Sequence, residues 1–143
     1  MIDLKKPAIQ QQALAAFFFA YQAFTAKPDE ILARRGLSRV HHRILFFIAQ
    51  SPGLSVSELL AYLGVSKQAL NAPLRQLIEM KLIAVKIAEH DKRVKQLSLT
   101  DAGQKLENQL TSLQMQHLET AFSAAGTTAE DGWIKVMAGL TAQ

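Results

Sequence analysis

The sequence predicts a mainly α-helical chain that carries one small β-hairpin. Residues 55–80 have the pattern of two helices separated by a turn at Gly64, because leucines recur at helical spacing on both sides of it. Apolar and polar residues then alternate over 83–87 and 97–99, which predicts two strands around a charged tip. Two helices joined by a tight turn and followed by a hairpin are typical of a winged helix-turn-helix, a fold that places a helix in a DNA groove.

The first helix is expected over residues 8–26. Its main apolar stripe consists of Leu14, Phe17, Tyr21 and Phe24. Phe18 and Phe19 widen this stripe well beyond a single face. A helix that is apolar over so much of its circumference must be covered on more than one side, so we infer a partner subunit. Pro28 is expected to end the helix, because proline disfavours α geometry in the residue before it.

Capping signals define the next elements. Residues 29–35 are expected to form a short helix or turn that Gly36 closes, and Ser38 is expected to cap a helix over 39–50. Ser55 and Glu58 form a capping box, Ser-x-x-Glu, ahead of the first helix of the helix-turn-helix.

The second helix of the pair is expected to read DNA. Ser66 can cap it, and its leucines point to the first helix. The side chains left on its outer face are Lys67, Gln68, Asn71 and Arg75. Gln and Asn can pair bidentately with adenine, and Arg and Lys with guanine. Pro73 inside this helix predicts a kink or a 3₁₀ turn near residues 69–73, or a fresh helix start that Asn71 caps.

The hairpin is expected to add contacts to the DNA backbone or minor groove. Lys86 and Lys95 are predicted to face outward, and Arg93 at the tip can reach a minor groove or a phosphate, with Lys92 beside it. Residues 66–95 carry a net charge of +4, as much as the whole chain. A second basic group, Arg34, Arg35, Arg39 and Arg43, could contact phosphates or form ion pairs within the protein.

Two helices are expected to complete the chain. Thr100 can cap one over 101–122, where His117 continues a stripe of leucines as a core or interface histidine. Thr127 and Glu130 form a second capping box ahead of a last helix, whose apolar face contains Trp133.

Composition excludes several classes of protein. A chain of 143 residues with 49% hydrophobic and 20% charged residues suits one globular domain. The absence of cysteine excludes disulfides, thiolate zinc sites and redox sensing by the chain's own thiols. Residues 1–7 do not resemble a signal peptide, and no stretch has the roughly 18 apolar residues of a membrane span. We therefore expect a cytoplasmic protein.

No enzyme, metal or cofactor pattern is present. The sequence lacks a Gly-rich phosphate loop and the HExxH motif. His41 and His42 are adjacent on a helix, so their side chains diverge by about 100° and do not readily share a metal. We expect no enzymatic activity, no metal site and no cofactor.

Asp91-x-Arg93, followed by Leu99-Thr100-x-x-Gly103, resembles the wing motif of the MarR family of bacterial transcription regulators. The resemblance extends over nearly the whole chain. It implies one domain over 1–143, in which residues 37–103 form the winged helix-turn-helix and residues 1–36 and 104–143 dimerise. It further implies that Asp91 positions Arg93 for the minor groove, and that a homodimer binds double-stranded DNA at a pseudo-palindromic operator.

The predicted DNA contacts are therefore Ser66, Lys67, Gln68, Asn71, Arg75, Lys92, Arg93 and Lys95. The chain departs from the family at Ala72, where many relatives have Arg, at Pro73, and at Lys81, where Gly is usual. We expect a changed turn geometry at Lys81 or a positive φ angle.

Family members often bind small phenolic ligands, so we expect a repressor whose affinity for DNA is lowered by a small aromatic effector. Phe17 and Tyr21 with His41 or His42 could line the pocket, although the aromatic residues also suit a core or dimer interface. The alternative function is a winged-helix protein-interaction module of the anti-repressor type. Ala72 and Pro73 favour it, because they disturb the recognition helix.

Overall fold

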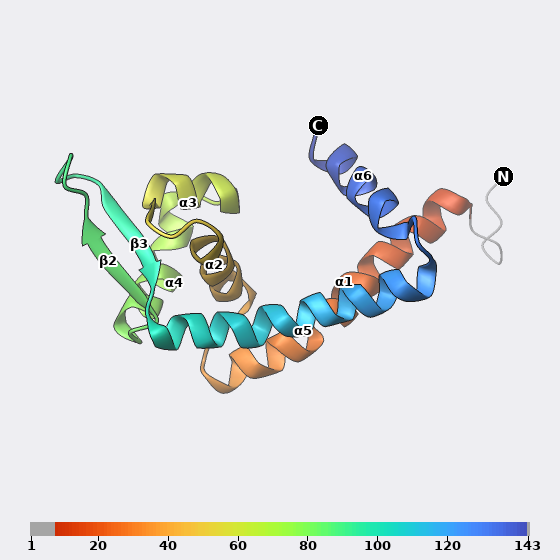
Figure 1. Cartoon of the computed structure of the whole chain (residues 1–143), viewed down its shortest axis with the longest axis horizontal. Helices are drawn as coiled ribbons and strands as arrows, with labels where there is room; N and C mark the ends of the chain where they lie inside the picture. The colour runs from red at the N-terminus through yellow and green to blue at the C-terminus, as the bar shows by residue number, and fades with distance from the viewer. Residues whose placement is uncertain (1–7, 143) are drawn as a thin grey trace.

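The computed structural model describes residues 8–142, so that residues 1–7 of the predicted dimerisation segment and residue 143 lie outside it. Within that range, six helices and a small antiparallel sheet confirm the predicted fold class. The elements are α1 (Ile9–Arg34), α2 (Arg39–Gln50), β1 (Leu54–Ser55), α3 (Val56–Leu63), α4 (Lys67–Glu79), β2 (Ile83–Ile87), β3 (Lys95–Leu99), α5 (Asp101–Ala125) and α6 (Ala129–Thr141). The winged helix-turn-helix occupies one end of an elongated molecule, and α1, α5 and α6 extend to the other (Figure 1).

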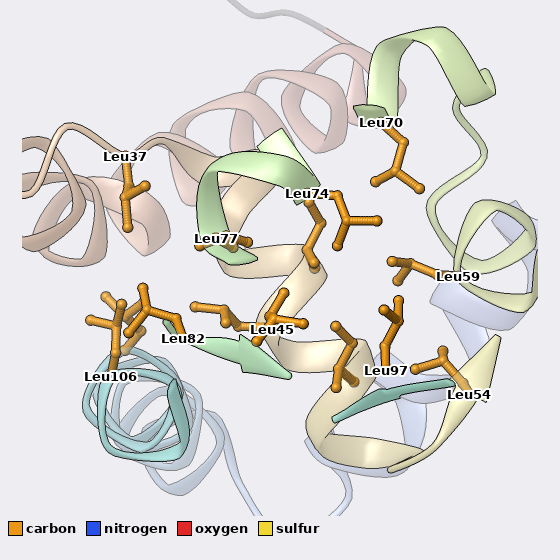
Figure 2. Packing of buried hydrophobic residues seen from close by; sticks show 14 of the residues in the cluster. Leu37, Leu45, Leu54, Leu59, Leu70, Leu74, Leu77, Leu82, Leu97 and Leu106 are labelled. Atoms are coloured by element: carbon orange, nitrogen blue, oxygen red, sulfur yellow. The ribbon is translucent and has the colours of Figure 1, made fainter. Parts of the chain in front are cut away.

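The core lies almost entirely in the winged-helix end. Leucines from α2, α3, α4 and the sheet converge around Leu45, and Leu106 joins them from the start of α5 (Figure 2). Leu32 near the end of α1 and Leu110 of α5 complete this cluster and are fully buried. The two long helices are therefore attached to the domain by their inner ends only.

The sheet has the strand order β1–β3–β2, and its two-residue strand β1 was not predicted. Lys86 pairs with Gln96, whereas Ile87 pairs with Lys95. Because directly paired residues of antiparallel strands share a face, Lys86 and Lys95 lie on opposite faces of the hairpin. Both are exposed. The apolar alternation predicted for β2 gives burial only at Ile83, because the hairpin extends beyond the core.

The prediction that α1 ends before Pro28 is wrong. The helix continues through Pro28 to Arg34. Pro28 and Leu32 are both buried, so burial of the last turns in the core offsets the lost backbone hydrogen bond, which costs about 3 kcal/mol in a helix interior. Gly36 ends the helix as expected, with a φ of +72°.

The predicted 3₁₀ turn near residues 69–73 and the alternative of a fresh helix start at Asn71 are both wrong. Helix α4 is α-helical without interruption from Lys67 to Glu79, and Asn71 caps no second start. Leu70, Leu74 and Leu77 are buried on both sides of the proline. Burial of this apolar face on both sides of Pro73 offsets the local cost of the proline.

The corner between α4 and the wing explains the Leu-Thr-x-x-Gly motif. Lys81 has a φ of +60°, which confirms the strained alternative predicted for it. The Thr100 hydroxyl donates to the Lys81 carbonyl at 2.7 Å and accepts from the Gly103 amide at 3.0 Å. A side chain on Gly103 would collide with the carbonyl oxygen of Leu82. The motif thus joins the wing, the end of α4 and the start of α5.

No helix within residues 8–142 is both long enough and apolar enough to cross a membrane.

Candidate nucleic-acid interface

Helix α4 presents an exposed polar surface. Its N-terminus is fixed by Ser66, whose hydroxyl accepts a hydrogen bond from the Ala69 amide at 3.1 Å. The four predicted reading side chains, Lys67, Gln68, Asn71 and Arg75, are all exposed. At about 100° per residue, they span an arc of roughly 100° that lies beside the face of the buried leucines and does not overlap it. Between residues 8 and 142, no hydrogen bond or ion pair engages any of these four side chains.

The wing tip carries a positioned arginine. Arg93 donates from Nε to Oδ1 of Asp91 at 3.1 Å and from Nη2 to Oδ2 at 3.2 Å, and its backbone amide donates to Oδ1 at 3.0 Å. The hydrogen bond from the Arg93 side chain, followed by that from its amide, lowers the pKa of Asp91. The Arg93 side chain is nevertheless 91% exposed. Its guanidinium is therefore oriented and still available to a further partner.

The remaining wing residues extend this basic surface. Lys92 and Lys95 are exposed beside Arg93. The hairpin and α4 lie at the same end of the molecule (Figure 1). The structure thus brings the predicted helix and wing residues to one end of the fold, in two separate elements that can contact adjacent stretches of a duplex.

The four arginines of the second basic group differ in their contacts. Arg39 Nε lies 2.8 Å from Asp29 Oδ2, and its guanidinium lies 5.3 Å from the centre of the Tyr21 ring. The hydrogen bond to Asp29 is the main cause that raises the pKa of Arg39. Arg34, Arg35 and Arg43 are exposed. Arg39 therefore links α1 to α2 within the protein.

An open apolar cavity lies at the other end of the molecule. It measures about 560 Å³ and is formed by α1, the second half of α5 and α6. Phe17 and Tyr21 line it, as do residues that the sequence analysis did not assign to a pocket: Phe24, His117, Phe122 and Trp133. His117 is exposed and stacks on Phe24, with ring centres 6.1 Å apart, so it is not a core histidine. The sequence feature from which the cavity could have been predicted is the wide apolar arc of each of these helices.

His41 and His42 do not line this cavity, which corrects their predicted place beside Phe17 and Tyr21. Each is buried and hydrogen-bonded to another helix. His41 Nε2 lies 2.8 Å from Gln76 Oε1 of α4. His42 Nε2 lies 3.2 Å from the hydroxyl of Thr111 on α5, and burial lowers the pKa of His42. The two rings point to different neighbours because adjacent helical side chains diverge by about 100°.

Thr111 connects His42 to a buried carboxylate. The Thr111 hydroxyl donates to Oε1 of Glu107 at 2.8 Å, and Gln104 donates to Oε2 at 3.2 Å. Because the hydroxyl proton is used in this way, the Thr111 oxygen accepts from His42 Nε2. This chain of hydrogen bonds joins α2 to α5 and was not visible in the sequence.

Comparison with known proteins identifies the family. A model of the MarR family matches residues 35–94. The HTH-type transcriptional regulator PetP of Rhodobacter capsulatus is 42% identical over 127 residues, which are 89% of this chain and 76% of that protein.

Two solved structures are also similar to this chain. A Staphylococcus aureus MepR mutant bound to an oligodeoxyribonucleotide has a TM-score of 0.63 and 24% identity, over 90% of this chain and 93% of that one. Staphylococcus aureus MarR in complex with salicylate and kanamycin has a TM-score of 0.72 and 26% identity, over 93% and 90% of the two chains.

These findings do not favour the anti-repressor alternative. It rested on a recognition helix disturbed by Ala72 and Pro73, and α4 is unbroken. The chain belongs to the MarR family and is a DNA-binding transcriptional regulator.

Proposed function

We propose that this regulator is a homodimeric repressor that reads a pseudo-palindromic operator through α4 and the wing. The observation that carries the proposal is the unengaged polar arc of α4 at the same end of the fold as the exposed Arg93. Lys67, Gln68, Asn71 and Arg75 would read base edges in the major groove. Ser66, Lys92 and Lys95 would contact the backbone, and Arg93, positioned by Asp91, would enter the minor groove. Such a protein works in the bacterial cytoplasm, where the DNA lies.

The exposed apolar surface of α1, α5 and α6 supports the homodimer. Phe18 and Phe19 are 65% and 70% exposed, and no residue of α6 is buried in the single chain. Large contiguous apolar surfaces of this kind mark interaction sites. A two-fold axis through these helices would leave both winged-helix ends free, with two recognition helices roughly 34–36 Å apart on one face of the duplex.

The cavity supports control by a small aromatic or phenolic ligand. Phe17 and Tyr21 supply flat apolar surfaces, and the Arg39 guanidinium lies over the Tyr21 ring. The related Staphylococcus aureus MarR, 26% identical, has been solved with salicylate. We propose that an effector of this class binds beside Phe17 and Tyr21 and lowers the affinity for the operator, because it stabilises a different arrangement of the two winged-helix ends.

The test measures the affinity of the protein for a fragment of its own promoter and for a scrambled duplex of the same length. Fluorescence anisotropy reports the binding at each concentration of a salt series. Log affinity should fall with log salt by about 0.9 for each phosphate contacted, and the promoter should bind at least about a thousandfold more tightly than the scrambled duplex. Equal affinity for the two duplexes would refute a sequence-specific repressor.

A matched pair of variants tests the assigned surface. Arg75→Ala removes one exposed positive charge from α4, and Lys27→Ala removes one from α1, outside the segment 37–103 assigned to the winged helix-turn-helix. Arg75→Ala should lower promoter affinity about tenfold, whereas Lys27→Ala should have little effect. Equal losses would mean that net charge alone is responsible.

A further inference from the structure

Gln76 connects the recognition helix to the corner between α1 and α2. Its Oε1 lies 2.8 Å from Nε2 of His41, and its Nε2 donates to the carbonyl oxygen of Gly36 at 3.1 Å. His41 is 6% exposed and lies in the first turn of α2. Residues 36–41 and residue 76 are far apart in the sequence, so this link exists only in the folded chain.

The direction of each hydrogen bond is determined. The backbone amide of Ser38 donates to Nδ1 of His41 at 3.0 Å, so Nδ1 carries no proton. The ring proton of the neutral imidazole is then on Nε2, which donates to Gln76 Oε1. The carboxamide nitrogen of Gln76 in turn donates to Gly36, whose carbonyl can only accept. This ordered chain defines one orientation for the amide of Gln76.

Directional contacts of this kind limit how the helix can move. Leu70, Leu74 and Leu77 attach α4 to the core through apolar contacts, which depend little on direction and permit small rotations and shifts. Gln76 lies on the flank of the helix, outside this leucine face, and its two hydrogen bonds require fixed distances and angles to Gly36 and His41. Rotation of α4 about its axis would break both bonds.

We propose that Gln76 is a positioning residue for DNA reading, which sets the rotation of α4 and hence the direction in which Asn71 and Arg75 meet the bases. The inference rests on the proposed function of α4 as the reading helix. Gly36 ends α1, and Arg39 at the same corner contacts Asp29 and Tyr21 of α1. Gln76 therefore also joins the reading helix to the corner that follows α1, the helix that lines the cavity.

Three variants separate positioning from stability. Gln76→Met keeps the length and neutral charge of the side chain but makes neither hydrogen bond. His41→Gln keeps an acceptor for the Ser38 amide, because Gln is a usual partner in a capping box, but does not provide the ring nitrogen that meets Gln76. Thr111→Val is the control, since it removes a hydrogen bond of α2 to α5 and leaves α4 unaffected.

An operator duplex is first selected from a random library with the full-length wild type. The affinity of each full-length variant is then measured for this operator and for a scrambled duplex, and its melting temperature is measured by thermal unfolding. Gln76→Met should lower the ratio of operator to scrambled affinity roughly tenfold. His41→Gln should lower it by a smaller factor, because the bond from Gln76 to Gly36 remains. The double variant should lose no more than Gln76→Met, which already lacks both bonds. Affinity for the scrambled duplex should not change. Thr111→Val should lower the melting temperature and leave the ratio intact.

An unchanged ratio in folded Gln76→Met would overturn the positioning role while leaving the proposed function in place. Additive losses in the double variant would also overturn it. If the library selection returns no preferred duplex for the wild type, the proposed function fails first, and the positioning role fails with it.

Discussion

Both carboxylate oxygens of Asp91 accept hydrogen bonds from the Arg93 side chain, which reaches back across a single residue at the wing tip. Arg93→Ala should lower operator affinity about tenfold and reduce the slope of log affinity against log salt by about 1 per wing inserted. Arg93→Lys should keep the slope but lose affinity, because an ammonium group lacks the planar fork that meets Asp91. Salt titrations of the two variants provide the measurement. Wild-type affinity in Arg93→Ala would remove the wing from the interface.

The exposed aromatic residues of α1 predict the oligomeric state. Phe18→Asp should increase the dimer dissociation constant at least about 100-fold, because a symmetric interface loses two buried aromatic side chains and gains two buried charges. Ile87→Asp is the control, since Ile87 is a comparably exposed apolar residue on the wing. Sedimentation velocity should detect monomers only for the α1 variant. A monomeric wild type, or a dimer that tolerates Phe18→Asp, would contradict this interface.

The left-handed conformation of Lys81 predicts a stabilising substitution. Lys81→Gly should increase the free energy of unfolding by about 1 kcal/mol, because glycine adopts a positive φ without the steric cost of a Cβ. Lys81→Ala keeps the Cβ and removes the charge, so it should not give this gain. Urea unfolding of both variants distinguishes relief of strain from loss of charge. Equal stabilities would show that the corner is unstrained.

The buried His42 predicts acid sensitivity. Burial lowers its pKa from the ordinary value of about 6.5, so the unfolded chain binds more protons at this site than the folded chain does. The free energy of unfolding should therefore fall as the pH decreases from about 6.5 to the lowered pKa, and this contribution should level off below it. His42→Gln should remove this part of the pH dependence. Parallel urea titrations from pH 8 to pH 5 measure the difference, and identical slopes would exclude His42 as its source.

Local chemistry made most of the fold and the reading surface predictable. The capping box of Ser55, the capping hydroxyls of Ser66 and Thr100, and the spacing of the leucines act within a few residues of the chain. The outward set on α4 followed from helical periodicity alone. The positive φ of Lys81 was among the alternatives predicted, because the chain has a side chain where relatives have glycine.

Tertiary contacts decided what local preference could not. The sequence by itself determined the order of the elements, the exposed face of α4 and the basic wing tip. The structure decided that α1 and α4 continue through Pro28 and Pro73, because core burial of neighbouring leucines outweighs the local cost of a proline. It also decided that His41 meets Gln76 and His42 meets Thr111, since residues separated by 35 and 69 positions become neighbours only when the helices pack.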